Sequence, residues 1–409
     1  MIFLFYIIEF LSLLYFILKK RKFDFLSLAY FSQIVYFIPA FLGVTYYMNN
    51  KYLVEESISD KTYIVLCIFV FCLIFITIIT DLMKNRYIFY YQYQKTMIGE
   101  ISLIVSIISL FLIFEKNGLI LFKLEKKYLM NMIPQSLLIM EITAIISSVV
   151  FYLEKKYKLL IISLTILSID LFIGFRYSLI IVIISIIFIY LNNKGEIRLI
   201  NLWKEGIFLI LLAFILLISK EFMYGLKFGF SNDFVNKIIN IDFYLNSIKH
   251  SEPFTIMSIL NEVVIHNFEV PLTQLNAFIK IIPFSKSLFN YISISYNDKF
   301  QKILFPNISY GMANNILAQM WSLGGYIAVV LFSLLNAIFL VLGNKLLNSK
   351  IHAVVVIIFS LQAFYIFRND LLYQITLEKK ILLIYFVIFL NYIIFKSIKN
   401  KFIKNKGFK

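Results

Sequence analysis

The sequence predicts an all-α polytopic membrane protein, and three observations lead to this fold class. Apolar residues make up 61% of the 409 residues and charged residues only 15%, whereas soluble domains contain about 45–50% apolar and about 25% charged residues. Apolar runs of roughly 16 to 22 residues recur along the chain, and a helix of that length crosses a hydrocarbon core about 30 Å thick. Helices are expected because a spanning segment must satisfy its own backbone hydrogen bonds.

About eleven transmembrane helices are expected. They comprise residues 2–18, 25–47, 63–80, 97–115, 134–153, 159–174, 177–192, 206–221, 316–343, 351–367 and 381–396. Successive connections between the spans lie on alternate sides of the membrane, and basic residues are about twice as frequent on one side as on the other. The basic side begins with Lys19 to Lys22 and ends with the tail from Lys396 to Lys409. The positive-inside rule therefore predicts an amino terminus outside and a cytoplasmic carboxyl terminus. Because the first run has basic residues only after it, we interpret it as a span and not as a cleaved signal.

One connection is much longer than the others and divides the chain into three regions. We expect residues 1–220 to hold the first eight helices, residues 221–315 to form a large extracytoplasmic loop, and residues 316–409 to hold the last three helices and a basic tail. Proline residues break the loop into short pieces. Within it, Phe254 to Glu269 carries apolar residues at helical spacing. We expect these pieces to form a small cap that lies on the outer membrane surface.

Several function classes are excluded by what the sequence lacks. The net charge of +16 follows the expected topology, and no zinc-finger spacing or basic patch with stacking aromatic residues indicates nucleic-acid binding. Cys67 and Cys72 lie within one apolar run, so we expect neither a disulfide bond nor a metal site there. No phosphate-binding loop, dinucleotide motif, zinc-protease motif or serine elbow is present. We therefore expect no cofactor, and an energy source that arrives with the substrate.

Two arginine residues are expected at the outer ends of helices. Arg176 lies in Gly174-Phe-Arg-Tyr-Ser178, between two adjacent apolar runs, and Arg368 lies in Phe367-Arg-Asn-Asp370 after the tenth. A guanidinium group is always charged and its forked donors match the geometry of a phosphate. Each arginine could instead extend to the lipid headgroups.

Four lysine residues of the outer region could add positive charge above these arginines. Lys220 and Lys227 are seven residues apart, which places them on one helical face, and Lys280 and Lys286 follow later in the loop. Together they could form an electropositive funnel. The alternative is a lysine face that is solvated or directed toward lipid headgroups.

The loop also holds the candidates for a general base. Glu262 and His266 are four residues apart and therefore neighbours on a helix surface, and His250 and Glu252 are a second pair just before them. A carboxylate beside an imidazole can accept a proton during catalysis, although either pair could also be an ordinary solvated face. Two such groups without a third ligand make a poor metal site, so no metal is expected.

Two acidic residues lie inside apolar runs, where an ionisable group is costly and usually faces the interior of the helix bundle. These are Glu141 and Asp170. Asp170 precedes Arg176 by six residues, so we expect at most a supporting role at that site. Helix packing is the alternative for both.

The sequence resembles the O-antigen (oligosaccharide repeat unit) polymerase family. The resemblance is carried by Gly311-Met-Ala-Asn-Asn315, by Ala318-Gln-Met-Trp-Ser-Leu-Gly-Gly-Tyr326, and by Gly174-Phe-Arg-Tyr-Ser-Leu179. Phe278 to Lys286 and Phe367 to Asp370 also look like family segments. Gln319 stands where many members have Glu, and Gly324-Gly325 replaces a spaced glycine pair.

The resemblance implies a GT-C-like membrane glycosyltransferase in a bacterial cytoplasmic (inner) membrane. Such an enzyme joins undecaprenyl-pyrophosphate-linked oligosaccharide repeat units on the outer face of that membrane. Arg176 and Arg368, aided by Lys220, Lys227, Lys280 or Lys286, would hold the pyrophosphate. Glu262 or His266, or else Glu252 or His250, would accept the proton of the acceptor hydroxyl. A flippase and a chain-length regulator are the partners that the resemblance suggests.

Three other functions fit the same sequence features. A flippase or exporter of the lipid-linked repeat would also need buried basic residues, although transporters favour internal repeats, and none is visible here. A ligase of related architecture would transfer a finished glycan to another acceptor. A non-catalytic assembly or sensor protein would use the long loop as a docking surface.

Overall fold

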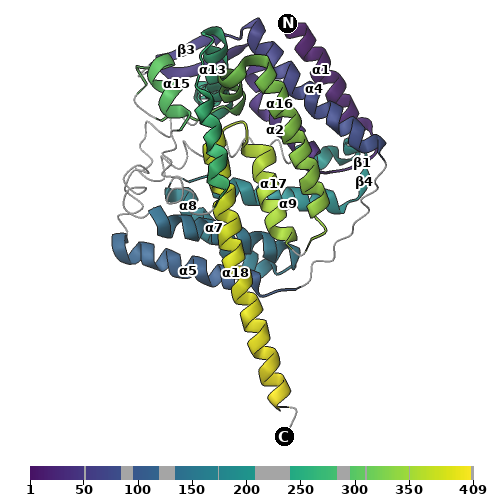
Figure 1. The fold of residues 1–409 in the computed structure, drawn as a ribbon, viewed down its shortest axis with the longest axis vertical. Coiled ribbons are helices and arrows are strands. Elements are labelled where there is room, and N and C mark those ends of the chain that lie inside the picture. Colours follow the sequence, from purple (N-terminus) through teal and green to yellow (C-terminus); the bar gives the residue numbers. More distant parts are fainter. Residues whose placement is uncertain are drawn as a thin grey trace.

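The computed structural model describes residues 1–49, 52–83, 95–118, 134–173, 175–207, 240–282, 295–308, 311–349 and 351–406. Helices dominate these ranges (Figure 1). In the first half of the chain the elements are α1 (Ile2–Leu18), β1 (Arg21–Lys22), α2 (Phe25–Tyr36), α3 (Ile38–Leu42), β2 (Val44–Asn49), β3 (Tyr52–Ser57), α4 (Asp60–Leu82), α5 (Ile98–Asn117), α7 (Pro134–Leu153), α8 (Tyr157–Ile173), α9 (Tyr177–Asn193), β4 (Glu196–Ile197) and η2 (Leu199–Leu202). In the second half they are α12 (Ile241–Lys249), α13 (Glu252–Ile265), η3 (Leu272–Ile281), α15 (Asn297–Leu304), α16 (Ile316–Leu346), α17 (His352–Tyr365) and α18 (Leu371–Lys406).

Five of the described helices are long and apolar enough to cross a membrane. They are Asp60–Leu82, Ile98–Lys116, Gln135–Leu153, Ile316–Leu346 and Leu371–Ile398. Four further apolar helices, α1, α2, α9 and α17, have between 10 and 17 residues. This is the pattern of a multi-pass α-helical membrane protein. The expected total of about eleven spans stays a prediction, and the expected span 206–221 lies almost entirely outside the described residues.

The helices do not all share one direction. In Figure 1, α16, α17 and α18 run roughly down the view, whereas α5 and α7 run across it. The carboxyl-terminal half of α18 extends away from the rest of the molecule (Figure 1). Two sets of helix ends are joined by charged groups, one around Arg21 and the other around Asp60.

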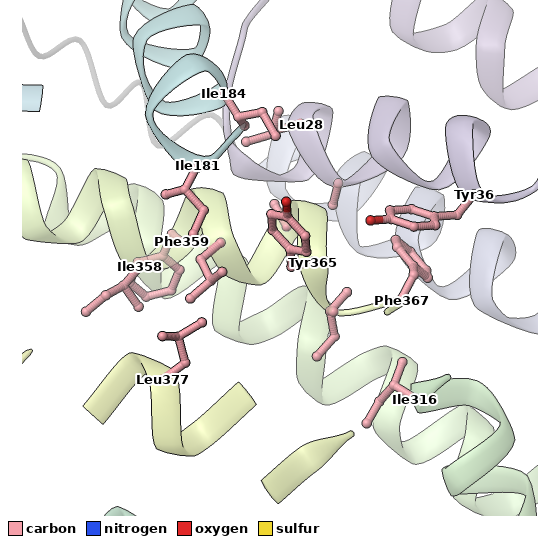
Figure 2. Close-up of a cluster of buried hydrophobic side chains, with 14 of the residues drawn as sticks. Leu28, Tyr36, Ile181, Ile184, Ile316, Ile358, Phe359, Tyr365, Phe367 and Leu377 are labelled. Atoms are coloured by element: carbon pink, nitrogen blue, oxygen red, sulfur yellow. The ribbon is translucent and has the colours of Figure 1, made fainter. Parts of the chain in front are cut away.

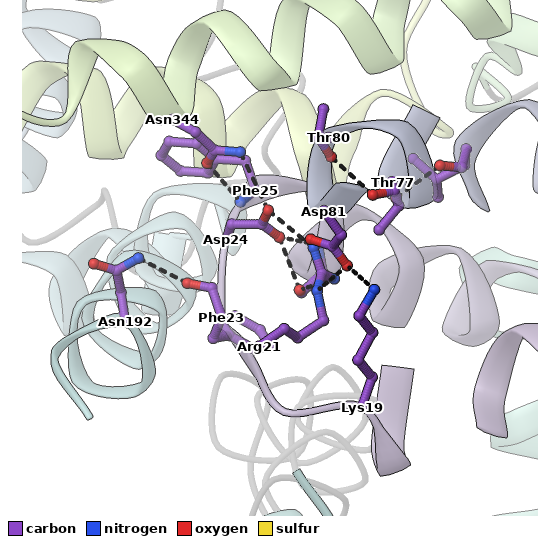
Figure 3. Close-up of polar contacts among 12 residues, drawn as sticks. Lys19, Arg21, Phe23, Asp24, Phe25, Thr77, Thr80, Asp81, Asn192 and Asn344 are labelled. Carbon is purple, nitrogen blue, oxygen red and sulfur yellow. Dashed lines mark hydrogen bonds and ion pairs between the residues drawn. The ribbon is translucent and has the colours of Figure 1, made fainter. Parts of the chain in front are cut away.

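A buried ionic network joins the helix ends at one of these two ends (Figure 3). The Arg21 side chain is only 4% exposed and lies 3.1 Å from the carboxylate of Asp24 and 3.4 Å from that of Asp81. Lys19 is 3.3 Å from Asp81 as well. The Asn344 side chain of α16 accepts a hydrogen bond from the Phe25 backbone N–H at 3.0 Å. The network thereby ties α16 to the ends of α1, α2 and α4.

The opposite end is where α1 and α4 begin. The terminal amino group of Met1 lies 3.2 Å from the carboxylate of Asp60. Helix α16 begins on this side, because Asn315 donates to the Ile256 carbonyl of α13, whose Asn261 accepts a hydrogen bond from the Ser59 N–H just before α4. Helix α17 ends here as well, since the Asn314 N–H donates to the carbonyl of Arg368. The candidate site lies here.

The expected span 25–47 is wrong in its second half. The helix is interrupted at Phe37, restarts as α3 with Pro39 in its first turn, and ends at Gly43 in a left-handed conformation with φ of 75°. Val44 to Asn49 then pairs with β3 in an antiparallel hairpin. A proline lacks the N–H that a continuing helix needs, and the β-branched and aromatic residues that follow favour a strand.

The long helix α16 is also interrupted. Gly324 and Gly325 have non-helical dihedral angles, and Gly325 has a φ of 57°. This conformation is accessible to glycine at little cost. The expected span 316–343 is therefore two helical segments joined at a glycine pair.

The burial of helix α13 differs from the expectation that the pieces of the loop lie on the membrane surface. Ile256, Leu260, Val263 and Val264, the expected apolar stripe, are all at most 2% exposed. Residues of its other faces, such as Asn261, are buried too. The helix packs against β2, α2, α3, α4 and α16. It is therefore part of the core, whereas α12 from the same loop has no buried residue.

Candidate functional site

An ion pair between Arg368 and Glu252 is the centre of the candidate site. Arg368 lies in the connection between α17 and α18, and Glu252 is the first residue of α13. Their side chains are 35% and 29% exposed, so ligands have access to the pair. Burial lowers the pKa of Arg368, but the carboxylate of Glu252 and the nearby phenols outweigh this effect and raise the pKa above its ordinary value. The guanidinium group is therefore a permanent charge.

Three tyrosine side chains surround the guanidinium group of Arg368. Its central carbon lies 5.7 Å from the centroid of the Tyr365 ring, a cation–π distance. Tyr36 of α2 and Tyr373 of α18 also lie within electrostatic reach of Arg368. Figure 2 shows Tyr36 directed toward Tyr365. Tyr36 and Tyr365 are almost completely buried, whereas Tyr373 is 49% exposed.

Arg176 is the second guanidinium group at this site. It is the residue immediately before α9 and is partly buried. Its charge lowers the pKa of the Tyr365 hydroxyl, as does that of Arg368, so both arginines lie within electrostatic reach of one phenol. Among the described residues no carboxylate lies within ion-pair distance of Arg176. Both arginines that the sequence indicated separately therefore lie within electrostatic reach of Tyr365.

The two acidic residues of the apolar runs are engaged by the residues that follow Arg176. The Tyr177 hydroxyl donates to the carboxylate of Glu141, and the Ser178 hydroxyl donates to that of Asp170. The Asp170 carbonyl also accepts a hydrogen bond from the Phe175 N–H at 3.1 Å. These contacts fix the start of α9. The supporting role that we expected for Asp170 is consistent with this arrangement, and Glu141 has a similar one.

The segment that begins α16 lies against the Arg368 connection. The Asn314 N–H donates to the Arg368 carbonyl at 3.0 Å. The Gln319 side-chain oxygen accepts from the Leu371 N–H at 2.9 Å. Asn315 caps α16 and donates to the Ile256 carbonyl of α13 at 2.9 Å. Two of the segments that carry the family resemblance, around residues 311–319 and 367–370, are therefore in direct contact.

Asp370 has a structural role in this arrangement. One of its carboxylate oxygens accepts from the Tyr373 N–H at 2.7 Å and so caps α18. The other accepts from the Ser295 hydroxyl at 2.8 Å and from the Tyr296 N–H at 2.9 Å. With both oxygens occupied, Asp370 is a poor candidate for a catalytic base.

The expected pair Glu262 and His266 is formed, but at the far end of α13. The His266 ring nitrogen lies 3.2 Å from the Glu262 carboxylate. Ten residues separate Glu262 from Glu252, which corresponds to about 15 Å along a helix. The four candidate bases therefore belong to two groups, and Glu252 is in direct contact with Arg368.

The Glu262 group includes residues of the β2–β3 hairpin. Glu56 of β3 lies close enough to Glu262 and to Tyr47 of β2 for both side chains to influence its pKa. Burial and the neighbouring Glu262 carboxylate raise the pKa of Glu56 to about 7. Two carboxyl groups this close share a proton more readily than they both ionise. This group connects the hairpin to α13.

The remaining candidates lie elsewhere. His250 is exposed and follows α12, two residues before Glu252. Lys280 lies at the end of η3 against α18, where its carbonyl accepts a hydrogen bond from the Lys379 ammonium group at 2.5 Å. Lys379 is eight residues into α18, about 12 Å along the helix. No recorded contact within the described ranges joins Lys280 to either arginine. Lys220, Lys227 and Lys286 lie outside the described residues.

Tyr36, Tyr365 and Tyr373 were not anticipated from the sequence. They occur in apolar segments of a chain with 27 tyrosine residues. A tyrosine in such a segment therefore looks no different from an ordinary core residue in the sequence. Gln319 had a signal, because it is an amide at the start of an apolar run.

Comparison with known proteins adds no family assignment. No protein-family model, curated protein or solved structure matches this chain.

Proposed function

We propose that this protein is an oligosaccharide repeat unit polymerase of the outer face of the bacterial cytoplasmic membrane. The observation that carries the proposal is that Arg368 lies over the Tyr365 ring and that Arg176 is within electrostatic reach of the same side chain. Two fixed guanidinium groups at one helix-bundle end match the two phosphates of a pyrophosphate. The family resemblance supports the same substrate class, namely undecaprenyl-pyrophosphate-linked oligosaccharides.

In the proposed reaction the growing chain moves from one lipid carrier to the next repeat unit. The bond between the anomeric carbon of the chain and the pyrophosphate oxygen breaks, and a bond to a hydroxyl oxygen of the acceptor repeat forms. Undecaprenyl pyrophosphate leaves as an anion, which Arg176 and Arg368 stabilise. The hydroxyl proton goes to a carboxylate.

Glu252 is the preferred base of the four candidates because of its contact with Arg368. In the resting protein the guanidinium group neutralises this carboxylate. A bound pyrophosphate would compete for Arg368 and leave Glu252 able to accept a proton. Glu262 and His266 lie about 15 Å away along α13, which makes them weaker candidates for the same step.

Deleting the gene in a cell that produces the polysaccharide tests the proposal. A polymerase deletion leaves single repeat units on the cell surface in place of a ladder of longer chains. A flippase deletion leaves no repeat on the surface, and a ligase deletion leaves long chains on the lipid carrier. Either of the latter two results contradicts the proposal.

A further inference from the structure

Three polar side-chain atoms near the Arg368–Glu252 pair are buried and have no hydrogen-bond partner among the described residues. They are the side-chain oxygen of Asn314, the side-chain nitrogen of Gln319 and the hydroxyl of Tyr365. Gln319 is completely buried and Tyr365 is 3% exposed. Buried polar atoms in native proteins nearly always have a partner. Three exceptions around one arginine therefore need an explanation.

All three atoms belong to residues that are fixed around Arg368. The Asn314 N–H donates to the Arg368 carbonyl, and the Tyr365 ring lies under the guanidinium group. The Gln319 oxygen accepts from the N–H of Leu371, which leaves its NH₂ group as the orphan. The side chains are thus held in place by other contacts while one polar atom of each stays unused.

The chemistry of the unused atoms is neutral and mixed. Gln319 offers a donor, Asn314 offers an acceptor, and the Tyr365 hydroxyl can do either. A phosphate group offers only acceptors at neutral pH and would leave the Asn314 oxygen without a partner. A sugar ring carries hydroxyl groups, and each hydroxyl can donate and accept. A sugar is therefore a ligand whose groups can pair with each of these three kinds of atom.

We propose that Asn314, Gln319 and Tyr365 form a carbohydrate subsite beside the arginines. This inference rests on the proposed function and deepens it, because it assigns separate residues to the two parts of the substrate. The arginines bind the pyrophosphate, and the three neutral side chains bind hydroxyl groups of the sugar attached to it. Removing a neutral side chain therefore weakens recognition of the glycan and leaves recognition of the anion intact.

Binding measurements on the full-length protein in lipid nanodiscs test this assignment with two probes. One probe is undecaprenyl pyrophosphate without sugar, and the other is the lipid-linked single repeat purified from the deletion strain. We expect the wild-type protein to bind the repeat at least tenfold more tightly than the bare lipid. Gln319→Leu should reduce this ratio to less than about threefold with unchanged affinity for the bare lipid, and Tyr365→Phe should reduce the ratio to a similar extent.

The matched control is Tyr385→Phe. It also removes a phenolic hydroxyl from a buried tyrosine, but fourteen residues into α18, about 21 Å from the beginning of that helix. This variant should keep the full preference for the repeat. Arg368→Gln should weaken binding of both probes together.

Two results overturn the assignment in distinguishable ways. If the wild-type protein binds both probes equally, or if both neutral variants keep the tenfold preference, the subsite does not exist while the anion site stands. If the wild-type protein binds neither probe, the proposed function fails and the subsite fails with it. Water molecules filling the three orphan positions would give the first of these results.

Discussion

The guanidinium group of Arg368 is paired with the carboxylate of Glu252, a residue 116 positions earlier in the chain. The pair joins the connection between α17 and α18 to the first turn of α13, which is itself buried among helices from both halves of the sequence. A segment that looked like an external loop therefore supplies a residue to the candidate site.

The two groups of candidate bases can be separated by substitution. We expect Glu252→Gln to reduce chain formation by at least about 100-fold, the lower limit of the usual contribution of a general base. Glu262→Gln and His266→Ala should change it by less than about threefold, because these residues lie at the other end of α13. The measurement is the polysaccharide ladder from a complemented deletion strain, with protein level checked by immunoblot. A full ladder from Glu252→Gln would exclude this residue as the base.

Arg176 should be needed for chain formation and not for folding. A hydrogen bond to a charged group contributes about 1.5 to 3 kcal/mol, so Arg176→Ala should slow chain formation by roughly 10- to 100-fold at unchanged protein level. Arg176→Lys keeps the charge but loses the forked geometry and should retain part of the activity. The control is Arg198→Ala, which removes an exposed arginine from the opposite end of α9. If both alanine variants give the same ladder, Arg176 does not belong to the site.

The Glu56–Glu262 contact predicts that stability depends on pH. The pKa of Glu56 rises from an ordinary value of 4.5 to about 7 in the folded protein. Between these values the folded state binds a proton that the unfolded state has released, so the free energy of unfolding falls as pH rises through this window. We expect a loss of about 1 to 2 kcal/mol after allowing for solvent screening.

Thermal unfolding in detergent between pH 4.5 and 7.5 measures this loss. Glu56→Gln should flatten the pH profile, because the amide does not titrate. Glu55→Gln is the matched control, since Glu55 is the exposed neighbour on the same strand, and it should keep the wild-type slope. A Glu56→Gln profile as steep as that of the wild type would exclude Glu56 as the titrating group.

The Arg21 network predicts a large stability effect at the end opposite the site. Arg21→Ala leaves the carboxylates of Asp24 and Asp81 partly buried without their main partner. Breaking a buried ion pair from one side typically costs 3–5 kcal/mol, and we expect about 3 kcal/mol here because both carboxylates keep some solvent contact. Urea or detergent unfolding followed by circular dichroism measures the change. Activity per folded molecule should stay within twofold of the wild type, and a specific loss of activity would show that this end takes part in the reaction.

Hydropathy and spacing were sufficient for much of the helical framework. The apolar runs predicted α1 and α7 with the bounds that they have, and the spacing of four residues predicted the contact between Glu262 and His266. Both inferences depend only on local geometry, namely helix rise and helical repeat. Such patterns are visible in sequence because neighbouring residues carry them.

Neither the β2–β3 hairpin nor the Arg368–Glu252 ion pair could be predicted from local sequence patterns, and the two failed for different physical reasons. Residues 44–49 follow directly on the apolar run that forms α2 and α3, so hydropathy alone does not show where the helix ends and where β2 begins to pair with β3. The pairing of Arg368 with Glu252 depends on how distant segments pack, which no local pattern encodes. The amphipathic stripe of α13 indicated one buried face, yet neighbours on several sides bury most of the helix.

The reaction itself is the most direct test of the central claim, that Arg368 and Arg176 stabilise a leaving pyrophosphate. Purified protein in proteoliposomes is mixed with lipid-linked single repeats, and products and free undecaprenyl pyrophosphate are quantified together. We predict chains of two or more repeats, one undecaprenyl pyrophosphate released for each repeat joined, and loss of both products in Arg368→Gln. Repeats that cross the membrane without being joined, or chains that form equally well with Arg368→Gln, would contradict the account.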